Sequence, residues 1–167
     1  LIPKVYTQDR IVRVLGEDGG SRQGTLGQEQ ALPDGRVKLF DLAAGKYDVE
    51  WDGNSSLCDG AVSAVPCNDA VVLSDIDLQT SGALDVNVPA VQISGAVTID
   101  GQPMPAASED RGALELRRQD GSSISTSSFG AGGPATYQIT LVAGTYDVGW
   151  DGNSSLCSGA VSPVPCN

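Results

Sequence analysis

Histidine is absent from the 167-residue chain, and lysine occurs only at Lys4, Lys38 and Lys46. The lack of histidine removes the usual general base and the Ser-His and Cys-His nucleophile pairs. A Ser-Lys pair repeated in both halves is excluded too, because residues 88–167 contain no lysine. Carboxylates are plentiful, but several lie beside glycine in sequences typical of turns. We therefore expect a protein that is not an enzyme and that uses no cofactor.

Positive charge is scarce, since 10 Lys and Arg residues stand against 21 Asp and Glu residues. Contacts with nucleic acid or with anionic membrane surfaces need clustered basic side chains. The only adjacent basic pair here is Arg117-Arg118. No apolar run approaches the ~20 residues of a membrane helix. The sequence therefore predicts no nucleic-acid partner and no membrane insertion by this segment.

Helical periodicity is also missing, and aromatic residues make up only 5% of the chain. The 21 glycines and nine prolines, scattered among short alternating apolar runs, favour a turn-rich all-β protein. We expect almost no helix. The predicted strands in the second half are Val91–Ile99, Ala113–Arg117, Tyr137–Leu141 and Tyr146–Trp150. Three further short strands are expected at Ala70–Leu73, Ile76–Leu78 and Ala83–Val88.

An internal repeat organises the chain. The segment AGKYDVEWDGNSSLCDGAVSAVPCN begins at Ala44, and AGTYDVGWDGNSSLCSGAVSPVPCN begins at Ala143, 99 residues later, with four differences in 25 positions. Upstream, Ile11–Gly19 resembles Ala113–Gly121. The repeat predicts two small domains, residues 1–87 and 88–167.

The two copies have unequal ends. The first lacks a counterpart of Ser94–Ala107, and the second lacks a counterpart of Asp69–Asn87. We expect each domain to lack strands that a neighbour supplies, either the next repeat of a longer array or another molecule that adds a strand head to tail. The first residue is Leu and no signal peptide is present, so we expect a processed chain or a fragment.

The four cysteines repeat one spacing, with nine residues between Cys58 and Cys67 and between Cys157 and Cys166. Four cysteines allow three pairings, and the repeat favours the local one. Each short loop would stabilise its domain by roughly 2–3 kcal/mol. A zinc site would need closer cysteine pairs or histidine, so no metal site is expected. Disulfides predict an extracellular or cell-surface location.

A tryptophan-led loop, Trp-Asp-Gly-Asn-Ser-Ser, occurs once in each copy. An indole beside Asp and Asn could stack on a sugar, which makes a glycan-binding module the alternative function. The structural interpretation, in which the indole ends a buried strand and the loop begins there, is favoured. Asn54 and Asn153 also match the N-glycosylation sequon. The candidate ligand-binding residues are Trp51, Asp52, Asn54, Trp150, Asp151 and Asn153.

The second copy resembles a known family through three short motifs. These are Ser94-Gly95-Ala96-Val97, Asp100-Gly101-Gln102-Pro103 and the segment Leu141–Val148 (LVAGTYDV). Together they resemble the transthyretin-like (prealbumin-like) carboxypeptidase-regulatory type of domain. The resemblance implies tandem seven-stranded Greek-key β-sandwiches that act as surface modules and carry no catalytic residues. The first copy departs from the pattern because it lacks the Ser-Gly-x-Val strand.

The cysteine-bearing tail around Val-Pro is similar to tandem repeats in secreted proteins of gliding, predatory bacteria. Taken together, these features predict an extracellular structural repeat unit of a surface stalk, adhesin or filament. Its expected partners are neighbouring repeats or further copies of itself, with glycan as the alternative.

Overall fold

The computed structural model describes residues 10–16, 21–26, 43–58, 63–80, 82, 84–158 and 163–166, with residues 10–16 and 21–26 described through their backbone. The described chain is all-β, as predicted. Its helical residues are confined to two single 3-10 turns, η1 (Ser55–Cys58) and η2 (Ser154–Cys157). No helix among the described residues is long and apolar enough to cross a membrane.

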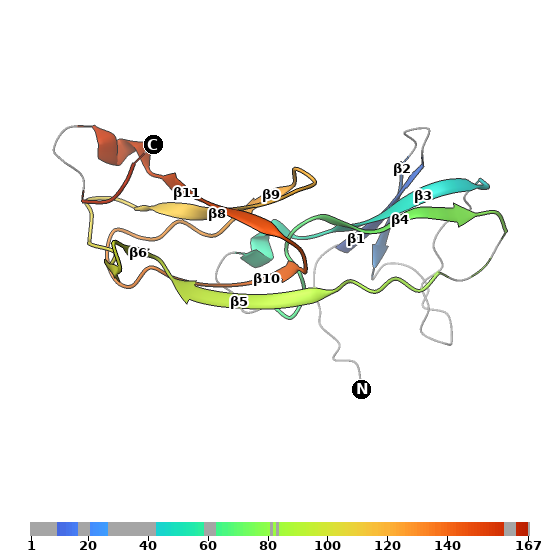
Figure 1. Ribbon diagram of the computed structural model, residues 1–167, viewed down its shortest axis with the longest axis horizontal. Helices are drawn as coiled ribbons and strands as arrows, with labels where there is room; N and C mark the ends of the chain where they lie inside the picture. The colour runs from blue at the N-terminus through green and yellow to red at the C-terminus, as the bar shows by residue number, and fades with distance from the viewer. Residues whose placement is uncertain are drawn as a thin grey trace. The chain divides into compact units, whose positions relative to one another are not determined.

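The chain forms two compact units (Figure 1). Unit 1 comprises Leu1–Asn54 and Asp69–Pro89, and unit 2 comprises Ser55–Asn68 and Ala90–Asn167. The division expected from the repeat differs chiefly in residues 55–68, which it assigned to the first domain. The contacts that group this segment with unit 2 are described with the candidate site.

The described residues of unit 1 form an antiparallel sheet of four strands in the order β2-β1-β3-β4. The strands are β1 (Arg10–Gly16), β2 (Ser21–Leu26), β3 (Gly45–Asp52) and β4 (Ala70–Leu78). Val49 and Trp51, two residues apart on β3, are both buried, as the alternation of a half-buried strand requires.

Strand β4 joins two segments that the sequence analysis separated, Ala70–Leu73 and Ile76–Leu78. Its register against β3 shifts between the pairs Tyr47↔Ile76 and Val49↔Leu73. Asp75 takes a positive φ of 57° in this bulge, and its backbone N–H donates to Oδ1 of Asp48 at 2.9 Å. The break in alternation is therefore a bulge inside one strand.

Unit 2 has two principal sheets, which appear as two layers in Figure 1. One pairs β5 (Ala90–Ala96) with β10 (Thr136–Val142), and the other has the order β11-β8-β9. The other strands of the unit are β8 (Gly112–Arg118), β9 (Ser123–Ser125), β11 (Tyr146–Gly152) and the short hairpin of β6 (Thr98–Ile99) and β7 (Gln102–Pro103). The strand expected at Ala83–Val88 was wrong, because residues 84–89 form none.

Among its described residues, unit 2 has two buried clusters that draw on both sheets. One contains Leu116 of β8 and Ile139 and Leu141 of β10, together with Cys58 and Cys67. The other contains the side chains of Met104, Phe129, Ala135, Leu156 and Val164. Both cysteine-containing loops therefore supply side chains to the core of unit 2, but to different clusters.

The repeat is visible in strand pairing. Val12 lies opposite Trp51 in the pair β1–β3, and Leu114 lies opposite Trp150 in the pair β8–β11. The arrangement β2-β1-β3 of unit 1 therefore matches β9-β8-β11 of unit 2.

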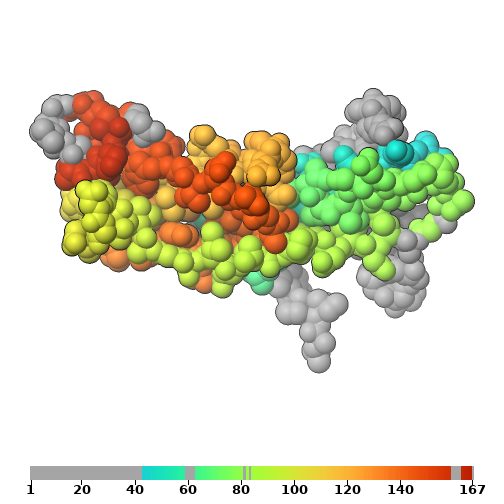
Figure 2. Space-filling view, in the orientation of Figure 1, coloured from blue at the N-terminus to red at the C-terminus, as the bar shows by residue number. Residues whose placement is uncertain are grey.

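The outer side of that arrangement differs between the units. Strand β4 pairs with the far edge of β3, whereas no strand of the described chain pairs with the far edge of β11. Figure 2 shows β11 uncovered on this face of unit 2. Val148 of β11 is 65% exposed, although Val49, its repeat counterpart, is 1% exposed. Similar sequences thus have different surroundings.

Candidate functional site

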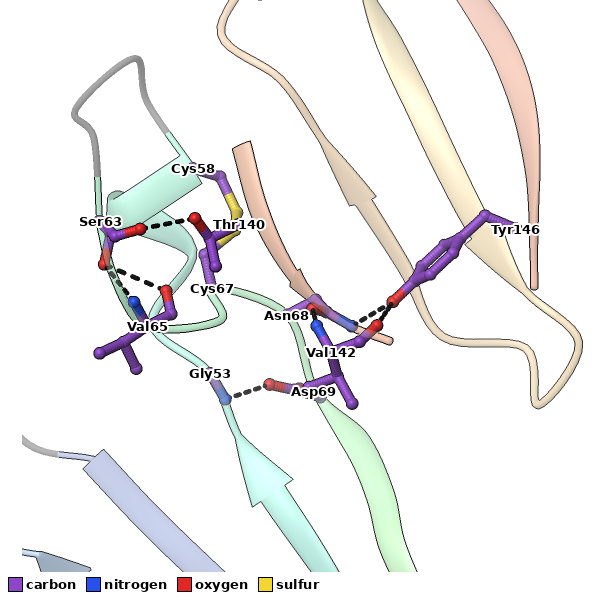
Figure 3. Close-up of a disulfide and its surroundings, with 10 residues drawn as sticks. All are labelled: Gly53, Cys58, Ser63, Val65, Cys67, Asn68, Asp69, Thr140, Val142 and Tyr146. Atoms are coloured by element: carbon purple, nitrogen blue, oxygen red, sulfur yellow. Dashed lines mark hydrogen bonds between the residues drawn. A yellow bond between two sulfur atoms is a disulfide. The ribbon is translucent and has the colours of Figure 1, made fainter. Parts of the chain in front are cut away.

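The loop that leaves unit 1 between β3 and β4 is held by bonds of its own. At its base, within unit 1, the backbone N–H of Gly53 donates to Oδ1 of Asp69 at 2.8 Å. Within the loop, Cys58 and Cys67 form a disulfide with a Cα–Cα distance of 5.5 Å. Ser63 Oγ donates to the Val65 carbonyl at 3.0 Å and accepts from the Val65 N–H at 3.1 Å. These bonds join the described residues on the two sides of the loop (Figure 3).

The described residues of this loop, 55–58 and 63–68, lie beside β10 (Figure 3). The Cys67 N–H donates to the carbonyl of Thr140 at 3.0 Å. The Thr140 hydroxyl donates back to the carbonyl of Ser63. Because the other edge of β10 pairs with β5, the loop satisfies the edge that would otherwise remain open. We call residues 55–68 the seated loop.

Asn68 clamps the end of the seated loop. Its Oδ1 accepts from the Val142 N–H at 2.8 Å, and its Nδ2 donates to the Tyr146 phenol oxygen at 3.1 Å. The Tyr146 hydroxyl in turn donates to the Val142 carbonyl at 2.6 Å. The Val142 N–H is therefore the donor and the Tyr146 phenol oxygen the acceptor for the two polar atoms of one carboxamide. The bond from the Tyr146 hydroxyl to the Val142 carbonyl joins these two residues. We call these two residues the Asn socket.

The disulfide of the seated loop belongs to the hydrophobic core. Cys58 and Cys67 are 2% and 1% exposed and pack with Leu116, Ile139 and Leu141. Removing apolar surface from water contributes about 25 cal/mol per Å², so a buried cystine adds to stability beyond its effect on the unfolded chain. The seated loop is thus held by an edge pairing, a carboxamide clamp and apolar burial.

The second copy of the loop makes a different set of contacts within unit 2. Cys157 and Cys166 form its disulfide, with a Cα–Cα distance of 5.6 Å. Leu156 and Val164 are buried in the cluster of Met104 and Phe129. Cys157, in contrast, is exposed, and Cys166 is only partly buried. The cystine that is core in the first copy is therefore at the surface in the second.

The six candidate ligand-binding residues lie in two loops, with Trp51, Asp52 and Asn54 in unit 1 and Trp150, Asp151 and Asn153 in unit 2. Trp51 is 5% exposed, which leaves no open ring face of the kind that sugar stacking needs. Trp150 stacks on Phe129 at 6.1 Å between ring centroids, and its Nε1–H donates to the Pro165 carbonyl at 3.0 Å. These contacts favour the structural interpretation of both indoles.

The polar members of the two tryptophan loops also have structural contacts or surface positions. Asn153 caps η2, because its side chain accepts from the Ser155 N–H at 3.0 Å. Its Nδ2 donates to the Asp110 carbonyl at 2.7 Å. Asp151 is exposed, and Asp52 and Asn54 are partly buried. Glycosylation of Asn54 and Asn153 stays a prediction.

Sequence reasoning missed the residues that hold the loops. Asn68 and Tyr146 are both present in the repeat, but nothing local marks them as partners. Arg111 was missed as well. It is 1% exposed, and its guanidinium donates to the carbonyls of Met104, Pro105, Gly130, Gly132 and Gly133. The Gly-rich segment 130–133 is therefore fastened by a buried cation.

No group of three or more metal-ligating side chains lies together in the described part of the chain. A family model described as phage P22-like portal protein matches residues 1–56. The matched segment ends inside η1 and includes neither the Asn socket nor most of the seated loop, and it does not assign the chain to that family. No curated protein and no solved structure matches the chain.

Proposed function

We propose that the chain is an extracellular structural repeat unit of a surface stalk, adhesin or filament, built from tandem transthyretin-like Greek-key β-sandwich modules. One observation carries the proposal: the disulfide loop of residues 55–68 belongs to unit 2, although the chain on either side of it belongs to unit 1. When a loop of one module is part of the fold of the next module, the two modules fold together. This suits a protein that joins modules and does not catalyse a reaction.

The two disulfides support an oxidising, extracellular setting. The strand pairing shared by β2-β1-β3 and β9-β8-β11 supports repetition of one module. The net charge of −11 keeps such a surface soluble and makes lateral association dependent on salt.

Stretching single oxidised chains between their termini tests this function. A structural repeat should resist force. Each intact disulfide should prevent extension of the chain between its two cysteines, which are nine residues apart in the sequence. Reduction should lengthen the fully extended chain by about 30 Å per loop. Extension of the oxidised chain without force peaks, as for an unstructured polymer, would refute the proposed role.

A further inference from the structure

The side chain of Val148 lies on the core side of its sheet but is uncovered. On β11 it shares its side of the strand with Tyr146 and Trp150, which pack against the two buried clusters of unit 2. Its cross-strand neighbour on β8, Leu116, is 3% exposed, whereas Val148 is 65% exposed. An apolar side chain that faces the core side therefore remains in contact with water.

The backbone of β11 has hydrogen-bonding groups that point away from β8. The Leu114 N–H of β8 donates to Thr126 Oγ1 at 3.1 Å, and the Leu114 carbonyl accepts from the Thr126 N–H at 2.9 Å. Leu114 thus turns its backbone groups away from its partner on β11, Trp150. Because bonded positions alternate along an antiparallel pair, Trp150 and Val148 turn their N–H and C=O groups to the outer edge. No strand of the described chain pairs with them there.

The corresponding edge of unit 1 is covered by β4. This strand pairs with the outer edge of β3 and places Leu73 opposite Val49, the repeat counterpart of Val148. Val49 is 1% exposed. The same pairing places Ala70, a small residue, opposite Trp51. Unit 1 therefore shows which pattern of residues covers this edge of the module.

Unit 2 also keeps the side-chain acceptor that binds the bulge of β4. In unit 1 the N–H of Asp75 donates to Oδ1 of Asp48 at 2.9 Å. Asp147 of β11 stands at the repeat position of Asp48 and is exposed. A carboxylate is an acceptor for such a bond. The edge of β11 thus presents the backbone groups, the apolar side chain and the carboxylate that a strand like β4 requires.

We propose that the outer edge of β11 binds an extended strand with the residue pattern of β4, supplied by a further repeat of this module. In the register of unit 1, the strand places an apolar side chain opposite Val148, a backbone N–H on the Asp147 carboxylate and a small residue opposite Trp150. Main-chain bonds provide the affinity, and the matched side chains provide the specificity. This inference rests on the proposed structural function and names the surface through which one module receives a strand of another.

A synthetic peptide of residues 69–79, which contains β4, tests the inference when it is added to the isotope-labelled, oxidised native chain. We expect saturable nuclear magnetic resonance shifts along β11. The amide hydrogens of Val148 and Trp150 should exchange with solvent about tenfold more slowly or better when the peptide is bound. The amide of Gly149, which already faces β8, should change little. Val148→Asp should weaken binding by about tenfold or more.

Val91→Asp is the matched control, because it introduces the same charge at an exposed valine of β5, an edge strand of the other sheet in unit 2. This variant should bind the peptide as the native chain does. Peptide-induced shifts along β5 in place of β11 would assign the strand to the wrong edge and overturn the proposal.

A chain extended by residues 69–79 after Asn167 removes any dependence on the solubility of the peptide, since it carries a second β4 at the repeat position. In the extended chain, Val148→Asp should lower the denaturant midpoint, whereas in the native chain it should change the midpoint little. Unchanged exchange of the Val148 and Trp150 amides in the extended chain would overturn the proposal. Protection of these amides in the native chain that grows with its concentration would overturn it too, because the occupant is then a second β11. Neither result would affect the force-extension test of the structural function.

Discussion

The carboxamide of Asn68 and the phenol of Tyr146, 78 residues apart in the sequence, are joined by a hydrogen bond of 3.1 Å. The same carboxamide accepts from the Val142 N–H, so one side chain satisfies a backbone donor and a side-chain acceptor. Because Asn68 is 5% exposed, these partners replace water that the site excludes. Asn68, which follows Cys67 of the first disulfide in the sequence, is therefore a structural part of unit 2.

Asn68→Ala should destabilise unit 2 by about 1–3 kcal/mol, because it leaves the buried Val142 N–H without its acceptor. Denaturant unfolding followed by near-ultraviolet circular dichroism measures the change. Asn87→Ala is the matched control, since Asn87 is exposed and should change stability by less than about 0.5 kcal/mol. Equal stabilities for the two variants would contradict the clamp.

The two disulfides allow a matched comparison, because both loops have the same sequence separation of nine. The loop-closure term is therefore equal, about 2.5–3 kcal/mol for each bond. Replacing Cys58 and Cys67 with serine should cost more than replacing Cys157 and Cys166. The first pair places hydroxyls in the core, and burying a hydroxyl without a partner adds roughly 1–3 kcal/mol.

Free energies of unfolding for the two double-serine variants, measured against the oxidised native chain, decide this point. Reducing the native chain provides a common reference in which both bonds are open. The prediction fails if the variant without Cys157 and Cys166 is the less stable of the two.

The sequence was sufficient for features that depend on local pattern. Alternation predicted the all-β class and strands close to β8, β10 and β11. Local rules were less successful where a strand needs a partner. The sequence of residues 84–89 alternates as a strand does, but these residues form no strand. Alternation in the sequence does not by itself provide a neighbouring strand edge to pair with.

The candidate site lay beyond local reasoning for a related reason. Residues 55–68 and 154–167 are nearly identical, so sequence alone assigns them the same surroundings. Their contacts differ because the seated loop meets β10, which comes some 70 residues later in the chain. Arg111 was missed similarly, since its acceptors are backbone carbonyls, which any residue could provide.

The carboxyl of Asp120, in the turn between β8 and β9, gives a pH prediction. Burial alone would raise its pKa, but hydrogen bonds from the Ser122 side chain and backbone, with Arg118 nearby, lower the pKa below its ordinary value of 3.8. A carboxyl with a lowered pKa in the folded state stabilises the fold above the unfolded pKa. That contribution is lost as the pH falls through the lower, folded value.

Ser122→Ala should therefore raise the pKa of Asp120 toward 3.8, since it removes the side-chain hydrogen bond. Titration of the Asp120 carboxyl carbon by nuclear magnetic resonance measures this directly. The variant should lose stability above pH 3.8 and converge with the native chain in stronger acid. An unchanged pKa in Ser122→Ala would show that the Ser122 hydroxyl does not act on this carboxyl.

Arg111 provides the sharpest test of how unit 2 is held together. Its guanidinium donates to carbonyls at both ends of the segment from Met104 to Gly133. Arg111→Met preserves much of the apolar stem and removes every donor, which should cost about 2–4 kcal/mol and expose residues 130–133 to proteases. Arg111→Lys should lie between, since one ammonium cannot reach both groups of carbonyls. Arg117→Met, at an exposed arginine, should stay within about 0.5 kcal/mol of the native chain. If Arg111→Met and Arg117→Met unfold at the same denaturant concentration, the hydrogen bonds from Arg111 to the backbone carbonyls contribute nothing to stability.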